Sequence, residues 1–211
     1  MKYEVKVECH KGYVRNNMED SAFPPCGFHG VVEPPFSVAV ADGLGGHPGG
    51  EYASAIAVKY VKEVVDEFTF KEAMDKASME IATNHPLAAT TITMAVLKDT
   101  YADIYWIGDS PAIVIYKNGG SSMVTVPHVN NLGYLTSVLG GFDPTAYTYG
   151  HTRVSISEIK ALVLATDGLT AHVDPSEVAV LYEKGMDFVE VVLSRGAVDN
   201  VTVITIVPIF E

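Results

Sequence analysis

Four aspartates, Asp42, Asp109, Asp167 and Asp199, lie where apolar, strand-like runs of the sequence meet turns. Three of them adjoin a glycine, and because Asp-Gly pairs are common turn formers, each pair taken alone predicts no more than a turn. Strand ends can converge at one edge of a sheet. Carboxylates that converge there without basic partners repel one another, so they either stay protonated or bind cations. Ligands that are all oxygen favour Mg²⁺ or Mn²⁺.

The spacing of apolar residues predicts the elements that position these acids. Residues 2–9 alternate between apolar and charged side chains, which indicates a half-buried strand. Further apolar runs predict strands at 36–41, 90–97, 101–107, 112–117, 121–126, 160–166 and 200–209. Intervals of three and four residues predict helices at about 51–68, 70–83, 174–184 and 187–194. Residues 127–146 carry glycines and prolines without a period, so we expect an irregular excursion.

The order of these elements predicts an α+β fold. The strands between residues 90 and 126 are separated by short turns and are expected to form consecutive antiparallel hairpins. A parallel sheet is disfavoured because it would need helical crossovers between most of its strands. The 211 residues, 48% of them apolar, are enough for one domain over residues 1–211 with a continuous core.

The charge of the chain disfavours two classes of partner. Its 14 basic and 26 acidic side chains give a net charge of -12. Such a surface repels the phosphates of nucleic acids and anionic lipid headgroups, and no basic patch stands out in the sequence. We therefore expect no binding to nucleic acid or membranes. As a separate expectation, the protein is a monomer.

The cysteines and apolar runs predict a cytoplasmic protein. Two cysteines are too few for a disulfide framework, the apolar runs are too short to span a bilayer, and the opening segment MKYEVKVECH lacks the apolar part of a signal peptide. A zinc site would need the group Cys9, His10, Cys26 and His29. It is disfavoured because adjacent strand residues such as Cys9 and His10 point to opposite faces. The histidines outside any motif are expected to be structural or exposed: His85, His128, His151 and His172.

Six short stretches of the chain share their order and spacing with the motifs of a known enzyme family. They are residues 15–20 (RNNMED), 42–47 (DGLGGH), 89–91 (ATT), 108–110 (GDS), 166–169 (TDGL) and 199–202 (DNVT). The set resembles the metal-dependent PP2C-type protein phosphatases, in particular their small bacterial branch. The resemblance extends from about Gly12 to Val207. It implies a four-layer αββα sandwich, in which two stacked antiparallel sheets are flanked by helix pairs.

The resemblance also implies a set of metal ligands. Asp42 would bridge two Mn²⁺ or Mg²⁺ ions, the carbonyl oxygen of Gly43 would bind one of them, and Asp167 and Asp199 would complete the shell of the other. Two further acids, Glu19 and Asp20, would hold metal-bound waters. A third, weaker metal ion would bind at Asp109.

Two more residues take roles in the implied reaction, which is the hydrolysis of phosphoserine or phosphothreonine in proteins by a metal-bridging hydroxide. Arg15 would grip the substrate phosphate, since a guanidinium offers two parallel donors to two phosphate oxygens. Two metal ions would make hydroxide available near neutral pH and neutralise the phosphoryl oxygens. His47 would be the general acid, so that no bare alkoxide has to leave.

Other functions are compatible with parts of the pattern. A phosphatase of the sporulation and stress-response branch, related to stage II sporulation protein E, would act on an anti-sigma-factor antagonist with the same fold. A pseudophosphatase would bind a partner without catalysis, but it would be free to lose a ligand, and Asp42, Asp167 and Asp199 are all present. A metal-dependent nuclease is disfavoured by the acidic composition.

Overall fold

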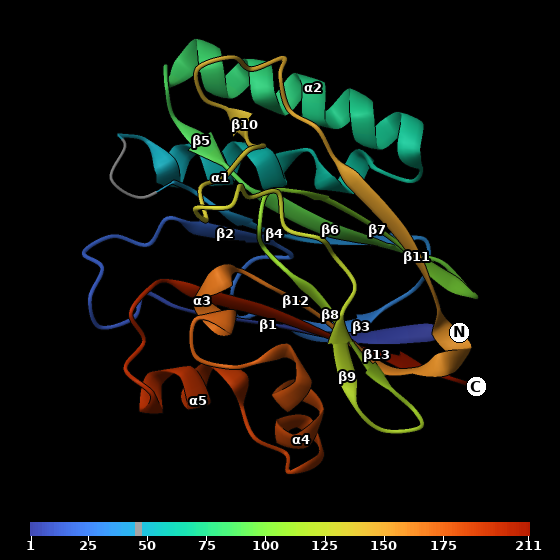
Figure 1. The fold of residues 1–211 in the computed structure, drawn as a ribbon. Helices are drawn as coiled ribbons and strands as arrows, with labels where there is room; N and C mark the ends of the chain where they lie inside the picture. The colour runs from blue at the N-terminus through green and yellow to red at the C-terminus, as the bar shows by residue number, and fades with distance from the viewer. Residues whose placement is uncertain (45–47) are drawn as a thin grey trace.

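Two antiparallel sheets stacked face to face form the centre of the computed structural model, which describes residues 1–44 and 48–211 (Figure 1). The larger sheet contains β1 (Lys2–His10), β3 (His29–Val32), β8 (Ala112–Tyr116), β9 (Ser121–Met123), β12 (Ile159–Ala165) and β13 (Val201–Ile209), in the order β3-β1-β13-β12-β8-β9. The smaller contains β2 (Asp20–Phe23), β4 (Phe36–Asp42), β6 (Ile92–Leu97), β7 (Tyr101–Ile107) and β11 (Gly150–Ser155), in the order β11-β7-β6-β4-β2. Two short strands, β5 (Ala89–Thr90) and β10 (Leu139–Gly140), pair separately.

Helices cover the outer face of each sheet (Figure 1). The smaller sheet packs against α1 (Gly50–Lys59) and α2 (Glu67–Asn84), and the larger against α3 (Asp167–Thr170), α4 (Val178–Glu183) and α5 (Phe188–Ser194). Short 3₁₀ helices lie at Val61–Glu63, Ile156–Glu158 and Pro175–Glu177. The predicted α+β class and four-layer αββα arrangement are confirmed. Within the described residues, no helix is long and apolar enough to cross a membrane.

Side chains along each strand point alternately to its two faces, and this alternation separates three apolar cores from one another. In β4, Val38 and Val40 pack between the two sheets, whereas Ala39 and Ala41 belong to the core beneath α1 and α2. The small helix-facing alanines allow α1 to lie close to the sheet. By the same alternation, the next even-numbered residue, Asp42, points towards the space between the sheets.

The prediction of one helix over 51–68 is wrong in its second half. The α1 helix ends at Lys59, and α2 begins at Glu67 instead of Phe70. The cause is the capping box at Asp66, whose carboxylate accepts a hydrogen bond from the Thr69 amide at 2.8 Å while the Thr69 hydroxyl accepts one from the Asp66 amide at 3.0 Å. Local capping therefore outweighs an apolar spacing that continues across the break.

The prediction of consecutive hairpins is wrong at one turn. β7 pairs with β6 and β11, whereas β8 pairs with β9 and β12, so the chain crosses from one sheet to the other at residues 108–111. Four strands were not predicted, β2, β3, β10 and β11, and neither was the short helix α3. The short strand β10 lies within residues 127–146, which otherwise form the expected irregular excursion.

The edge strand β11 is attached to β7 by a buried charge. Asp103, which is 4% exposed, accepts hydrogen bonds from Arg153 at 2.8 and 3.0 Å and pairs with His151 Nε2 at 2.9 Å. The Arg153 guanidinium also lies 3.9 Å from the centre of the Tyr101 ring. A buried carboxylate is stable only with hydrogen-bonding or charged partners. Because β11 supplies these partners, Asp103 stabilises the pairing of β11 with β7.

Cys9 and Cys26 form a disulfide bond that links the end of β1 to the turn between β2 and β3. Two cysteines exclude a framework of several disulfides, but this single bond was not predicted. While this bond is formed, neither sulfur atom is free to bind zinc.

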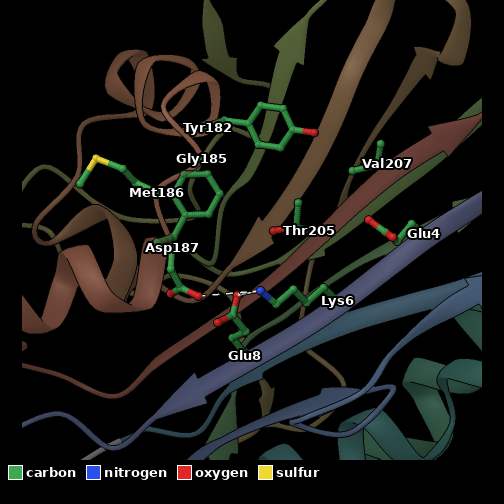
Figure 2. Close-up of a pocket in the computed structure, with 10 residues that line it drawn as sticks. Glu4, Lys6, Glu8, Tyr182, Gly185, Met186, Asp187, Thr205 and Val207 are labelled. Atoms are coloured by element: carbon green, nitrogen blue, oxygen red, sulfur yellow. Dashed lines mark ion pairs between the residues drawn. The ribbon is translucent and has the colours of Figure 1, made fainter.

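A polar hollow of about 250 Å³ lies on the helix side of the larger sheet, between β1, β13 and the connection from α4 to α5 (Figure 2). In it, the Lys6 ammonium lies 3.3 Å from Glu8 and 3.9 Å from Asp187. Burial raises the pKa of Glu8 to about 7, and Asp187 adds to the shift by hydrogen bonding and repulsion. The folded protein therefore holds a proton on Glu8 at pH values where the unfolded chain has released it.

We predict that Glu8→Gln stabilises the protein at pH 8 but not at pH 4.5. Since the folded pKa of Glu8 is raised, its contribution to stability is present below its usual value of 4.5 and is lost as the pH rises to about 7. Losing the partly exposed Lys6 pair offsets little of this gain. Thermal unfolding at several pH values should give a melting temperature about 2–4 °C higher at pH 8.

The matched control for this prediction is Glu4→Gln, on the same strand and the same hollow. It should leave the melting temperature unchanged at both pH values. Equal pH dependence of Glu8→Gln and the parent protein between pH 5 and 8 would contradict the role given to Glu8.

Candidate active site

Three carboxylates from both sheets converge at one end of the sandwich. Asp42 is the last residue of β4, Asp167 follows β12 as the first residue of α3, and Asp199 precedes β13. One oxygen atom from each lies within 4.8 Å of the others. Of the four aspartates predicted at strand ends, these three meet, and Asp109 is not one of the group.

Asp20 lies beside this group and is held by two threonines. It is the first residue of β2 and stands opposite Asp42 in the antiparallel ladder. One of its oxygens, Oδ2, accepts hydrogen bonds from the Thr166 hydroxyl at 2.8 Å and the Thr202 hydroxyl at 2.7 Å. Thr166 and Thr202 continue the alternation of β12 and β13 towards the space between the sheets. The two sheets are thus joined by hydrogen bonds directly behind the carboxylates.

Asn200 fixes the loop that carries Arg15 and Glu19. Its side-chain oxygen accepts a hydrogen bond from the Glu19 amide at 2.8 Å, and its Nδ2 donates to the carbonyl oxygens of Lys11 at 2.7 Å and Asn17 at 3.0 Å. Asn200, Thr166 and Thr202 lie within the motifs of the sequence, but no role was predicted for them. Signals for these roles were nevertheless present in the sequence. Thr166 and Asn200 each adjoin a predicted metal ligand, and Thr202 has the same parity as the core side chains of its strand.

Glu19 and Gly43 are brought together by close backbone packing. A Cβ atom on Gly43 would lie 2.0 Å from the carbonyl oxygen of Gly50, and one on Gly50 would lie 2.2 Å from Oε2 of Glu19. Because the Cβ on Gly50 would also lie 2.8 Å from the backbone carbonyl oxygen of Leu44, glycine is favoured at both positions. The Gly43 amide donates to the Glu19 carbonyl oxygen at 3.0 Å. The Glu19 side chain consequently lies at the N-terminus of α1, where negative charge is favoured.

A cavity of about 150 Å³ opens in front of the carboxylates. Its walls include Asp42, Asp167 and Asp199, together with Arg15 and Asp109. Arg15 is half-exposed, and its Nε lies 3.3 Å from Asp199 Oδ1. Arg15 is the single basic residue among those that line this cavity in the described part of the chain. It is the candidate for binding an anion beside the acids.

Asp109 lies on the wall of the cavity but outside the group of three carboxylates. It belongs to the crossing between the sheets at residues 108–111. The Thr91 hydroxyl, which accepts a hydrogen bond from the Asp42 amide at 3.2 Å, is also 2.8 Å from the hydroxyl of Ser110. This pair links the Asp109 turn to the end of β4.

Burial and, after it, neighbouring charges raise the pKa values of the acids in the site. Burial raises the pKa of Asp20 to about 7, although the hydrogen bonds from the two threonine hydroxyls lower it. The charge of Asp167 adds to the rise. Burial, followed by Asp20 and Asp167, places the pKa of Asp42 well above its usual range. Burial and then Asp167 raise the pKa of Asp109 to about 6. Without a cation, the site holds protons that acids in water would have released.

The residues fit a divalent cation. Three buried carboxylate oxygens have no hydrogen-bond partner among the described residues: Glu19 Oε2, Asp20 Oδ1 and Asp167 Oδ1. An unsatisfied buried acceptor costs about 1–3 kcal/mol or more, so partners that supply positive charge are favoured. The donors are all oxygen atoms, which is typical of Mg²⁺ and Mn²⁺ sites. His47 lies outside the described residues.

Similarity to known proteins agrees with this geometry. The family model for protein phosphatase 2C matches residues 26–200. The chain therefore belongs to the protein phosphatase 2C family, which confirms the predicted family and the prediction of a metal-dependent protein phosphatase.

Individual relatives are distant in sequence but alike in fold. A Mycoplasma genitalium protein assigned as a protein phosphatase is 24% identical over 179 residues, covering 65% of this chain and 68% of that protein. A crystal structure of a bacterial serine phosphatase matches with a TM-score of 0.81 at 19% identity and 98% coverage of both chains. The catalytic domain of the phosphatase PstP, in complex with two manganese ions, matches with a TM-score of 0.73 at 20% identity and 98% coverage of both.

We predict that Asp42→Asn stabilises the metal-free protein. Because ionising Asp42 is opposed by burial and by Asp20 and Asp167, removing its charge should increase the free energy of unfolding by about 1 kcal/mol or more at pH 8. Mn²⁺ at 100 times its dissociation constant should stabilise the parent protein by about 2.7 kcal/mol, and the variant much less. Thermal unfolding with and without Mn²⁺ measures both effects.

Glu72→Gln, an exposed acid on α2, is the control and should respond to Mn²⁺ as the parent protein does. The account of the site fails if Asp42→Asn destabilises the metal-free protein or retains the full Mn²⁺ effect.

Proposed function

We propose that this chain hydrolyses phosphoserine and phosphothreonine in proteins, in the cavity in front of Asp42, Asp167 and Asp199. The observation that carries the proposal is the convergence of these three carboxylates within 4.8 Å, beside a single arginine on the cavity wall among the described residues. A set of acids alone would repel a phosphate, whereas the same acids with bound cations would attract it.

The acids would hold two Mn²⁺ or Mg²⁺ ions. Asp42 would bind both, the Gly43 carbonyl oxygen would bind one, and Asp167 and Asp199 would bind the other, with Asp109 available to a third. Such ions supply a nucleophile from water near neutral pH and neutralise the phosphoryl oxygens. The unpartnered oxygens of Glu19 and Asp20 would accept hydrogen bonds from water in the site and so orient it.

Arg15 would bind the phosphate group of the substrate. Its guanidinium lies on the cavity wall, and Asp199 at 3.3 Å holds it there while leaving further N–H donors free for two phosphate oxygens. His47 would donate the proton to the leaving oxygen, because a serine or threonine alkoxide is a poor leaving group. This role rests on the family resemblance of the loop after Asp42.

The organisation of the protein follows from the same proposal. We infer that residues 1–211 make one catalytic domain, because the first strand, β1, and the last, β13, pair along nine residues each. We also infer a monomer whose partner is a phosphorylated protein and not nucleic acid or a membrane, on the strength of the net charge of -12.

We infer a cytoplasmic location, and the cysteine pair provides its test. Disulfides are rare in reducing compartments, so Cys9 and Cys26 should be free thiols in the cell and should form their bond only on oxidation. Alkylation of intact cells before lysis, followed by mass spectrometry, should find both cysteines modified. A disulfide that already exists in the cell would contradict the cytoplasmic location.

We predict hydrolysis of a phosphothreonine peptide that requires Mn²⁺ and stops in EDTA. Arg15→Ala should lower kcat/KM about 10- to 100-fold, since a hydrogen bond from a charged group contributes about 1.5–3 kcal/mol. Arg195→Ala is the matched control, because Arg195 pairs with Glu177 near α4 and does not line the cavity.

Hydrolysis that persists in EDTA would contradict the metal-dependent reaction. Inactivity of the folded, Mn²⁺-loaded protein on several phosphopeptides would instead favour a binding module without catalysis. Equal losses in Arg15→Ala and Arg195→Ala would contradict the placement of the phosphate.

A further inference from the structure

His128 is bonded twice to the turn that carries Asp109. The Gly108 amide donates a hydrogen bond to Nδ1 of the His128 ring at 3.0 Å. In the opposite direction, the His128 amide donates to the Gly108 carbonyl oxygen at 3.0 Å. Both polar groups of the Gly108 backbone are therefore bound by one residue, which lies 20 positions further along the chain. No motif of the sequence includes His128.

The Gly108 turn has few other conformations open to it. Gly108 is buried, with a φ angle of +102°, and a Cβ atom there would lie 2.6 Å from Cγ2 of Thr91. This left-handed backbone is accessible to glycine and unfavourable for other residues. Because the amide is buried, it needs an acceptor, and the ring of His128 supplies it. The next residue, Asp109, is thereby placed on the cavity wall.

The same histidine closes the base of a small hairpin that reaches the cavity. The Thr136 amide donates to the His128 carbonyl oxygen at 2.9 Å, and Val129 and Leu135 form an antiparallel bridge. Leu135 also lines the cavity with the site carboxylates. His128 thus connects two parts of the cavity wall: the turn with Asp109 and the hairpin with Leu135.

The ring itself is fixed by packing. It stacks on the Trp106 indole with 6.3 Å between ring centres and an angle of 20°. The indole in turn donates from Nε1 to the Val126 carbonyl oxygen at 2.8 Å, so the chain on either side of Pro127 is attached to the end of β7. The stack on Trp106 thus contributes to the orientation of the ring alongside the hydrogen bond that Nδ1 accepts.

We propose that His128 is a positioning residue for the reaction, which accepts the Gly108 hydrogen bond through Nδ1 and so holds Asp109 and Leu135 in the cavity wall. The ring must be neutral, with its proton on Nε2, because a protonated Nδ1 would face the Gly108 N–H as a second donor. Burial lowers the pKa of His128, which favours the neutral form. The catalytic part of this inference rests on the proposed phosphatase function.

Two variants separate the hydrogen bond from the packing. His128→Asn places an amide oxygen close to the position of Nδ1 and keeps the acceptor, whereas His128→Phe keeps a ring on Trp106 and removes the acceptor. We expect His128→Phe to speed hydrogen exchange of the Gly108 amide at least tenfold and to raise the Mn²⁺ concentration for half-maximal activity. Its kcat should fall about 10- to 100-fold with KM changed less than threefold, because a small displacement of a site group has effects of this size.

His128→Asn should stay within threefold of the parent protein in all of these measurements. Exchange at Gly108 is measured without substrate, so it tests the proposal even if the protein proves not to be a phosphatase. The proposal is overturned if His128→Phe behaves as the parent protein does, or if His128→Asn is as impaired as His128→Phe.

The parent protein provides an independent check should either variant fail to fold. Nitrogen-15 chemical shifts of the His128 ring at pH 7.5 should show an unprotonated Nδ1 and a protonated Nε2. A proton on Nδ1, or unprotected exchange at the Gly108 amide, would overturn the proposal.

Discussion

The mutual repulsion of partly buried carboxylates is the constraint on which the rest of this structure depends. Asp42, Asp167 and Asp199 approach within 4.8 Å, and Asp20 lies behind them with its pKa raised to about 7. Without further support, acids this close together would move apart or stay protonated, because their charges repel one another. The protein opposes the repulsion with rigid attachment: Asp20 accepts bonds from threonines of the other sheet, and Asn200 fixes the loop that follows β1.

The two-sheet architecture explains how acids far apart in the sequence meet. In β4, β12 and β13, side chains of one parity fill the core between the sheets, and the same parity leads to Asp42, Thr166 and Thr202 at the strand ends. The apolar core between the sheets therefore also sets the direction of the polar groups at its end. A shift of one residue in any of these strands would turn its site residue to the opposite face.

The residues that would carry out the chemistry could be predicted from the sequence more readily than the residues that hold them in place. The aspartates are recognisable because each follows or precedes an apolar run, and Arg15 because it belongs to a motif. Asn200 and His128 could not be assigned roles, since their partners are backbone groups brought near only by folding. The crossing after β7 was likewise hidden, because Gly108-Asp109-Ser110 is as suitable for a hairpin as for a change of sheet. The residues of the Asp66 capping box are visible in the sequence, but the prediction was based on the apolar spacing alone.

The central claim is that the three converging aspartates bind divalent metal ions. Anomalous diffraction at the manganese absorption edge, from crystals of the protein soaked in Mn²⁺, tests it most directly. The account predicts two strong peaks bounded by the carboxylates of Asp42, Asp167 and Asp199, and their loss in crystals of Asp42→Asn. Well-ordered carboxylates with no manganese peak between them, at a Mn²⁺ concentration that saturates any thermal stabilisation, would contradict it.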